Sequence, residues 1–211
     1  HSTETAKILQ HVDTIAHTAQ RGADLVQQLL IFGREDNLEQ KVVNVDSAIR
    51  SNKLILEKSV NNLIKLDFSF GDPGNIKANT ANFNQLLLNL IVNARDAISG
   101  EGHIRIETGT ESLPDHLDIG SGSAGEDWLY VKVSDSGIGI SDAKKERIFE
   151  PFFSTKELGE GTGLGLATVA TIMNRANGAI KVDSVPAKGT TFALYFPQCF
   201  SPVEAQAKES Q

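Results

Sequence analysis

The first 34 residues carry a regular spacing of apolar or small positions. These positions recur at alternating intervals of four and three residues, with polar residues between them. This period predicts a helix from about Thr3 to Arg34 with a narrow apolar seam. The seam consists of Ile8, Val12, Ile15, Ala19, Gly22, Val26 and Leu29. A seam of this kind favours a partner helix, and the alternative is a helix packed along its own domain.

After the polar stretch 35–41, the pattern changes to short alternating runs and amphipathic segments. Helices are expected at Ser47 to Lys58, Ala81 to Ile98, Asp142 to Phe149 and Gly163 to Asn177. Strands are expected at Val42 to Val45, Ile64 to Phe70, Asn75 to Ala78, His103 to Thr110, Trp128 to Ser134, Ala179 to Val185 and Thr190 to Phe196. Asn79 or Thr80 can cap the second of these helices. The order predicts an α+β fold, a two-layer α/β sandwich whose mixed, mostly antiparallel sheet is covered by helices.

Composition and charge narrow the classes of partner. The chain has 211 residues, of which 40% are hydrophobic and 22% charged, as in ordinary globular proteins. Its net charge is -7 and no window is rich in Lys and Arg, so nucleic-acid or anionic-membrane binding is not expected. The single cysteine, Cys199, cannot form an internal disulfide, and no zinc-binding spacing is present. This cysteine usage favours a cytoplasmic location. No apolar run approaches the roughly 20 residues of a membrane span, so the alternative is the cytoplasmic part of a membrane-bound protein whose span lies outside this sequence.

A first candidate motif is Asn89 to Ala97, within an expected helix. Asn89 and Asn93 are four residues apart, so they share one helical face. Two neutral amides on one face suit Mg²⁺ that is already neutralised by phosphates, because this ion takes few protein ligands. The alternative interpretation is that both asparagines are surface residues.

A second motif, Asp135 to Ile140, follows an apolar strand. An acidic side chain at a strand end can accept a hydrogen bond from an exocyclic amine such as that of adenine. Gly137 and Gly139 would let the backbone approach a ligand closely. A plain Asp-Ser-Gly turn is the alternative interpretation.

A third motif is the glycine-rich run Gly159 to Leu166, which opens an expected helix. Glycine amides at the positive end of a helix form an anion site suited to phosphates. No Gly-Lys-Ser/Thr is present and no apolar strand leads into this run, so it is neither a Walker P-loop nor a dinucleotide fingerprint.

In this order the motifs resemble those of a known family. Asn89 to Ala97, Asp135 to Gly139, Phe149 to Lys156, Gly161 to Leu166 and Lys188 to Phe192 look like the N box, first glycine box, F box, second glycine box and final glycine box. These boxes belong to the catalytic ATP-binding domain of sensor histidine kinases. That domain has the Bergerat-type fold and shares a superfamily, termed GHKL, with gyrase, MutL and heat-shock chaperone ATPases.

The resemblance implies ATP and Mg²⁺ as cofactors and a role for each matching position. Asn93 would ligate Mg²⁺, Asp135 would accept from the adenine amino group, and Thr190 would support the adenine pocket. Lys156, in a lid of residues 154–161, would be a phosphate partner. The phosphate contacts and lid hinge would be Gly161, Thr162, Gly163, Leu164, Gly165 and Leu166.

Two phenylalanines of the F box and one asparagine of the N box need separate interpretation. Phe149 and Phe152 would pack the base of the lid, or they are simple core residues. Asn89 occupies the position at which hydrolysing relatives carry a glutamate general base. An amide cannot take a proton, so the resemblance implies nucleotide binding and phosphoryl transfer without efficient hydrolysis.

The N-terminal helix also has a counterpart in the family. Gly22 to Arg34 is similar to the second helix of the dimerisation and histidine-phosphotransfer hairpin, and two such hairpins form a four-helix bundle. This implies a homodimer in the full-length protein. The expected division is residues 1–36 for the partial hairpin, 42–198 for the catalytic domain and 199–211 for a linker.

The phosphoacceptor of that hairpin is a histidine followed by an acidic residue. The histidines, none of which has this context, are His1, His11, His17, His103 and His116. We therefore expect the acceptor to lie outside this chain. The resemblance then implies a kinase core that binds Mg-ATP without labelling itself, partnered by a histidine-bearing hairpin and a response regulator or receiver domain. A non-catalytic nucleotide-binding module and an ATPase of the gyrase class are the alternatives.

Overall fold

The computed structural model describes residues 11–12, 22, 39–113, 127–156 and 162–201. The expected N-terminal helix lies outside this part of the chain, except for His11, Val12 and Gly22, which are helical. The glycine- and serine-rich stretch 120–125 and the tail from residue 202 also lie outside it.

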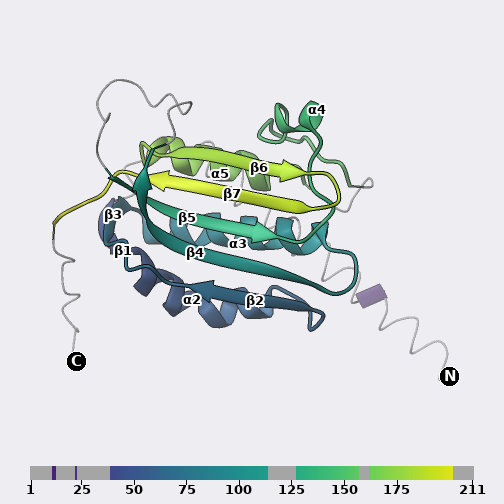
Figure 1. Cartoon of the computed structure of the whole chain (residues 1–211), viewed down its shortest axis with the longest axis horizontal. Coiled ribbons are helices and arrows are strands. Elements are labelled where there is room, and N and C mark those ends of the chain that lie inside the picture. Colours follow the sequence, from purple (N-terminus) through teal and green to yellow (C-terminus); the bar gives the residue numbers. More distant parts are fainter. Residues whose placement is uncertain (1–10, 13–21, 23–38, 114–126, 157–161, 202–211) are drawn as a thin grey trace.

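A five-stranded sheet forms one layer of the molecule (Figure 1). Its order is β2-β4-β5-β7-β6, in which β2 and β4 are parallel and the other neighbours antiparallel. The strands are β2 Ile64–Ser69, β4 Gly102–Ser112, β5 Asp127–Asp135, β6 Ala179–Val185 and β7 Gly189–Phe196. The sheet is therefore mixed and mostly antiparallel, as predicted.

Helices cover one face of this sheet and form the second layer (Figure 1). The elements outside the sheet are α2 Val45–Lys58, α3 Thr80–Ala97, α4 Asp142–Lys145 and α5 Gly165–Arg175, with β1 Lys41–Asn44 and β3 Asn75–Ala78. The short strands β1 and β3 pair antiparallel in a separate ribbon. The predicted α+β two-layer class is confirmed.

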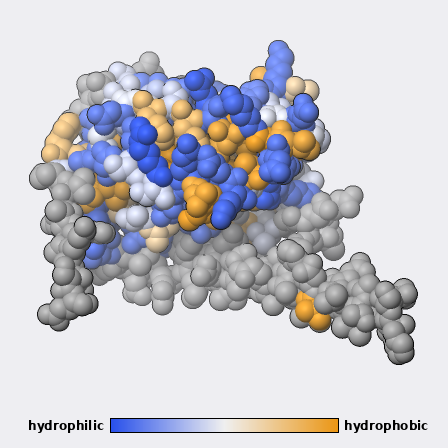
Figure 2. Space-filling model, turned by 90° about the horizontal axis from the view of Figure 1, so that it is seen from below, coloured by the Kyte–Doolittle hydropathy of each residue, from blue (hydrophilic) through white to orange (hydrophobic). Residues whose placement is uncertain are grey.

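The main core lies between the sheet and the helices. Alternate residues of the strands, such as Ile104 and Ile106 on β4 and Val131 on β5, are buried against α3. On α3 the buried positions include Leu86 and Leu90, one helical turn apart. Full burial of each such side chain contributes roughly 1.5–3 kcal/mol. Seen from the α2 and β2 side, the surface is mainly hydrophilic with scattered hydrophobic spots (Figure 2).

Several boundaries differ from the expected ones for local reasons. Val45 was expected in a strand, but it begins α2 because the side chain of Asn44 accepts a hydrogen bond from the Ser47 backbone N at 3.0 Å. Asn79, one of two expected caps, accepts from the Asn82 backbone N at 3.1 Å and starts α3. The expected helix 142–149 is shorter, since α4 ends at Lys145 and turns follow.

Candidate functional site

The chemistry-bearing segments meet at one end of the sheet. Asp135 is the last residue of β5, and the loop after it is bonded to the end of α3 by Ile138 N, which donates to Ala97 O at 2.9 Å. The middle of α3 is bonded to the start of α5, because Asn89 Nδ2 donates to Gly165 O at 3.2 Å. The end of β5, the second half of α3 and the start of α5, which are distant in sequence, are thus close together in the structure.

Asn89 and Asn93 lie on the α5-facing side of α3 but have different surroundings. Asn89 is 8% exposed, and both ends of its amide are engaged, since Gln85 Nε2 donates to its Oδ1 at 3.1 Å. The buried Nδ2 of Asn93 has no hydrogen-bond partner in the described part of the chain. A Cβ placed on Gly165 would lie 3.6 Å from this nitrogen. Asn89 therefore tethers α3 to the first residue of α5. Asn93, also on α3, has an unsatisfied donor next to the start of α5.

Asp135 is a buried carboxylate, 9% exposed. Burial raises its pKa, against the lowering effects of the backbone N–H groups of Gly137 and Thr190 and of the nearby His103. The Gly137 N–H donates to Asp135 Oδ1 at 2.8 Å. The carboxylate is held in one orientation by the loop that follows it and by β7, which pairs with β5 here.

The first glycine loop is packed tightly against protein backbone. A Cβ on Gly137 would lie 2.6 Å from Ala97 O, and one on Gly139 would lie 2.2 Å from Val185 O. Gly139 also has a φ of +69°, which side chains rarely adopt. The close approach that these glycines permit in the structure is to α3 and to the end of β6.

Ser184, which no sequence motif singles out, fixes this loop to the hairpin of β6 and β7. Its Oγ accepts from Ile140 N at 2.8 Å and donates to Gly189 O at 3.0 Å. It also lies 2.9 Å from Thr190 Oγ1. Thr190, expected at the site, lies opposite Asp135 in the pairing of β7 with β5.

The second glycine loop is described from Thr162 onward, and Gly161 lies outside the described residues. Gly163 has a φ of +66°, and its carbonyl accepts from Phe152 N at 3.0 Å. Thr162 Oγ1 accepts from Leu164 N at 3.3 Å. Leu164 is buried and Leu166 packs against the core, so these two leucines anchor the start of α5.

The F box residues divide between core and surface. Phe149 packs against the core, whereas Phe152 is 66% exposed with a φ of +67°. Lys156 Nζ forms an ion pair with Asp96 Oδ2 on α3. Asp96 was not singled out from the sequence, although its place three residues after Asn93 puts it on the same helical face.

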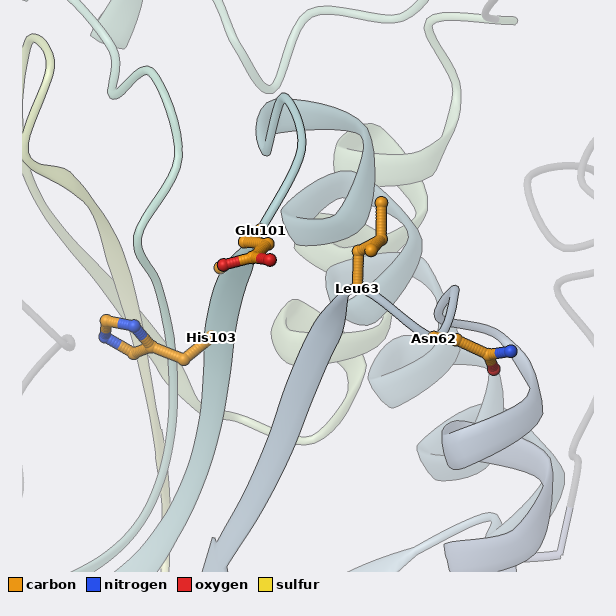
Figure 3. Close-up of a pocket in the computed structure, with 5 residues that line it drawn as sticks. Asn62, Leu63, Glu101 and His103 are labelled. Carbon is orange, nitrogen blue, oxygen red and sulfur yellow. The ribbon is translucent and has the colours of Figure 1, made fainter.

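A hollow between the starts of β2 and β4 is a weaker candidate. It is lined by Asn62, Leu63, Glu101, Gly102 and His103. The labelled side chains point away from one another and share no common centre (Figure 3). This arrangement does not assemble a set of groups that could hold one ligand.

The fold and the main site together define a class of protein. The structure has a mostly antiparallel sheet with helices on one face, an unsatisfied asparagine of α3 beside the start of α5, and a buried carboxylate at a strand end. These features agree with the expected resemblance to GHKL ATP-binding domains. Residues 78–199 match the family described as "Histidine kinase-, DNA gyrase B-, and HSP90-like ATPase". The chain belongs to this family.

Individual relatives narrow the class further. The chain is 37% identical over 204 residues to the sensor kinase CckA of Brucella abortus, covering 92% of this chain and 22% of that protein. It is 34% identical over 191 residues to the sensory histidine kinase/phosphatase NtrB of Rhodobacter capsulatus, covering 90% of this chain and 52% of that protein. The chain thus spans between about a fifth and about half of the length of these relatives.

A solved structure agrees with these relatives. The catalytic domain of histidine kinase ThkA has a TM-score of 0.60 and 28% identity, over 75% of this chain and 95% of that one. The chain is the ATP-binding catalytic core of a two-component sensor kinase, and the resemblance seen in the sequence is confirmed. Among the described residues, no helix is long and apolar enough to cross a bilayer.

Proposed function

We propose that this chain binds Mg-ATP and donates its γ-phosphoryl group to a histidine on a dimerisation hairpin, for relay to an aspartate of a response regulator. The bond between the γ-phosphorus and the bridging oxygen breaks, a phosphorus–nitrogen bond forms at the imidazole, and ADP leaves. Because the alignments cover 22% and 52% of these relatives, the hairpin, the regulator and the homodimer are part of the proposal.

The observation that carries the proposal is the unsatisfied, buried amide of Asn93. An unpaired buried donor is destabilising by about 1–3 kcal/mol, so a ligand group that accepts from it would bind favourably. A phosphate oxygen is such a group. The amide oxygen of the same side chain is a ligand type that Mg²⁺ takes, so Asn93 fits a magnesium-bound polyphosphate. When bound, Mg²⁺ would neutralise phosphate charge.

The adenine would lie against Asp135. Its carboxylate would accept a hydrogen bond from the exocyclic amino group, and Thr190 would support the pocket from β7. The tight packing of Gly137 and Gly139 supports this role, because it holds the loop and thereby the carboxylate in place.

The phosphates would lie at the start of α5. The first amides of a helix lack partners within the helix and carry partial positive charge, which favours anions. We assign phosphate contacts to Gly161, Thr162, Gly163, Leu164, Gly165 and Leu166, with Lys156 supplying a further positive charge. Asn89 lacks a basic group, and its amide is engaged by Gln85 and Gly165. This supports transfer by positioning and electrostatics instead of hydrolysis by a general base.

The proposed division of the chain follows the expected one. Residues 1–36 would be the second helix of the hairpin, 42–198 the catalytic domain and 199–211 a linker. In the full-length protein the hairpin would dimerise and would present the acceptor histidine.

The test has two stages. Calorimetric titration with a non-hydrolysable ATP analogue, with and without Mg²⁺, should show saturable binding that Asp135→Asn and Asn93→Ala weaken. Asp67→Asn, which removes a carboxylate paired with Lys65 on β2, is the matched control and should bind normally. A separately supplied histidine hairpin from a sensor kinase should then acquire acid-labile phosphate from labelled ATP.

The contrary outcomes are distinct. Binding without transfer to any hairpin would indicate a non-catalytic module, and steady phosphate release would indicate an ATPase. Wild-type protein that is folded and binds no nucleotide would contradict the proposal as a whole.

A further inference from the structure

Asp96 lies on the helical stripe of α3 that carries both site asparagines. Asn89, Asn93 and Asp96 follow one another at intervals of four and three, which places them along one face. Asn89 contacts Gly165 from this face, and Asn93 lies beside it. Asp96 therefore lies one helical turn beyond Asn93, on the face of α3 that borders the proposed phosphate site.

The carboxylate of Asp96 is held in place by its neighbour Arg95. Arg95 Nη2 lies 2.6 Å from Asp96 Oδ1, while Arg95 Nη1 donates to the backbone oxygen of Ser59 at 3.0 Å. Ser59 caps the end of α2. Arg95 thus fixes Asp96 against a neighbouring helix and leaves Oδ2 for another partner.

That partner is Lys156, at the base of the proposed lid. Lys156 Nζ pairs with Asp96 Oδ2, and the Lys156 backbone N–H donates to Ser154 Oγ at 3.2 Å. A few residues earlier, Phe152 N donates to Gly163 O at 3.0 Å, which bonds this segment to the second glycine loop. The segment 152–156 is therefore bonded both to the C-terminal end of α3, through Lys156, and to the loop assigned to the phosphates, through Phe152.

We propose that Asp96 is a positioning residue that competes with the nucleotide phosphates for Lys156. Without nucleotide, Asp96 holds the ammonium group beside α3. When a polyphosphate enters, Lys156 exchanges the carboxylate for phosphate oxygens, and Asp96 keeps its pair with Arg95. This inference rests on the proposed function, because it places the phosphates at the start of α5.

The exchange is physically reasonable because the Asp96–Lys156 pair is partly exposed and therefore weak. The side chains of Lys156 and Asp96 are 31% and 23% exposed. A polyphosphate carries more negative charge than one carboxylate and attracts the ammonium group more strongly. Because Arg95 remains on Oδ1, release of Lys156 does not leave the carboxylate unpaired. The competition should thus act on ATP and ADP and not on adenosine.

A double-mutant cycle tests this competition. The wild type, Asp96→Asn, Lys156→Met and the double variant are titrated with a non-hydrolysable ATP analogue, ADP and adenosine. Asp96→Asn should tighten binding of the analogue about two- to fivefold, the range expected for removal of a surface ion pair, and Lys156→Met should weaken it. In the Lys156→Met background, Asp96→Asn should have no effect. Adenosine should bind all four proteins equally.

Removal of the Asp96 charge also reduces the long-range repulsion between the protein and the phosphates. The cycle separates this repulsion from the competition for Lys156. If Asp96→Asn tightens analogue binding by the same factor with and without Lys156, Asp96 acts by charge alone and the inference is wrong. Unchanged or weaker binding by Asp96→Asn also overturns it. Asp67→Asn controls for general loss of charge, and thermal unfolding confirms that each variant is folded. Failure of the wild type to bind any nucleotide would instead contradict the proposed function.

Discussion

The side-chain amide of Asn89 donates a hydrogen bond to the backbone oxygen of Gly165, 76 positions later in the chain. This contact joins the middle of α3 to the first residue of α5. Since the amides that follow Gly165 form the start of a helix, the orientation of that helix end depends on a side chain from another element.

Replacement of Asn89 by Ala should therefore affect both stability and binding. We expect the free energy of unfolding to fall by about 1–2 kcal/mol, the value of a lost buried hydrogen bond with an unpaired partner. Nucleotide affinity should also fall, because the start of α5 loses its tether. Urea unfolding and calorimetric titration measure the two effects.

The matched control for that substitution is Asn84→Ala. Asn84 Oδ1 accepts from Asn52 Nδ2 at 2.9 Å, so this asparagine ties α3 to α2 and not to α5. Asn84→Ala should lower stability and leave nucleotide affinity unchanged. If both variants lost affinity equally, the tether would have no special role at the site.

Gly163→Ala should be more harmful than Gly74→Ala. Both glycines have positive φ, +66° and +92°, and a side chain in this region costs roughly 1–2 kcal/mol. Only at Gly163 would the new Cβ lie 2.4 Å from backbone, at the carbonyl carbon of Phe152, whereas the space around Gly74 is open. The difference in unfolding free energy between the two variants isolates the clash, which we expect to add about 1–3 kcal/mol. Equal losses would contradict the tight contact of Phe152 with Gly163.

The buried carboxylate of Asp135 should make nucleotide binding sensitive to mildly acidic pH. Burial raises the pKa of Asp135, and a protonated carboxyl accepts less well from the adenine amino group. Affinity should therefore decline as the pH falls through this raised pKa, above the range of an ordinary aspartate. Titrations with the ATP analogue at a series of pH values measure this decline, and a constant affinity would contradict the assigned role.

The same raised pKa predicts a stability difference between wild type and Asp135→Asn. The favourable contribution of the protonated group is complete below the pKa of the unfolded aspartate, and it is lost as the pH rises through the higher pKa of the folded state. Asp135→Asn lacks this loss, so its stability relative to the wild type should increase over that interval. Urea unfolding of both proteins at each pH gives the comparison, and parallel curves would rule out the pKa shift.

The two tyrosines should ionise well above their ordinary range. Tyr130 donates to Glu107 Oε1 at 3.0 Å and Tyr195 donates to Glu111 Oε1 at 2.7 Å. Burial, together with the bond to Glu107, raises the pKa of Tyr130 to about 12, and burial also raises the pKa of Tyr195. Their stabilising contribution is complete below the pKa of unfolded tyrosine, about 10, and is lost as the pH rises through the folded values.

Ultraviolet titration measures the ionisation of Tyr130 and Tyr195 directly, because the chain contains no other tyrosine. Tyrosinate absorbance should appear at a higher pH in the native protein than in denaturant. Tyr130→Phe should leave one transition, that of Tyr195. Coincident native and denatured curves would show that neither hydroxyl is held by its glutamate.

Local chemistry made much of the fold predictable. The strand Asn75–Ala78 and the cap at Asn79 were expected and are present, because a turn and a capping side chain act within a few residues. Val45 misled the prediction, since its alternation with Val43 is typical of a strand. The helix begins at Val45 instead, because Asn44 caps it. In the sequence this cap is indicated by only one side chain, which is a weaker signal than the alternation.

The candidate site was predictable where a residue's surroundings come from its own segment. Asn93, Asp135 and Gly163 were singled out in this way, and their roles stay predictions. Ser184 and Asp96 were missed because their importance depends on partners from other elements, Gly189 and Ile140 for the first and Lys156 for the second. No spacing rule connects such residues before the fold is known.

Asn75 of β3 has neighbours from both ends of the folded unit. Asn44 pairs with it on one side, and Cys199, three residues past β7, bridges to it on the other. Two strand spacings separate these neighbours, so Asn44, the last residue of β1, and Cys199 lie about 10 Å apart. This corner lies at the end of the sheet where Phe196 pairs with Leu129, and the site lies at the other end, where Thr190 pairs with Asp135. Any domains fused before β1 and after residue 201 would therefore attach on the same side of the domain, about 20 Å along the strands from the loop that follows Asp135.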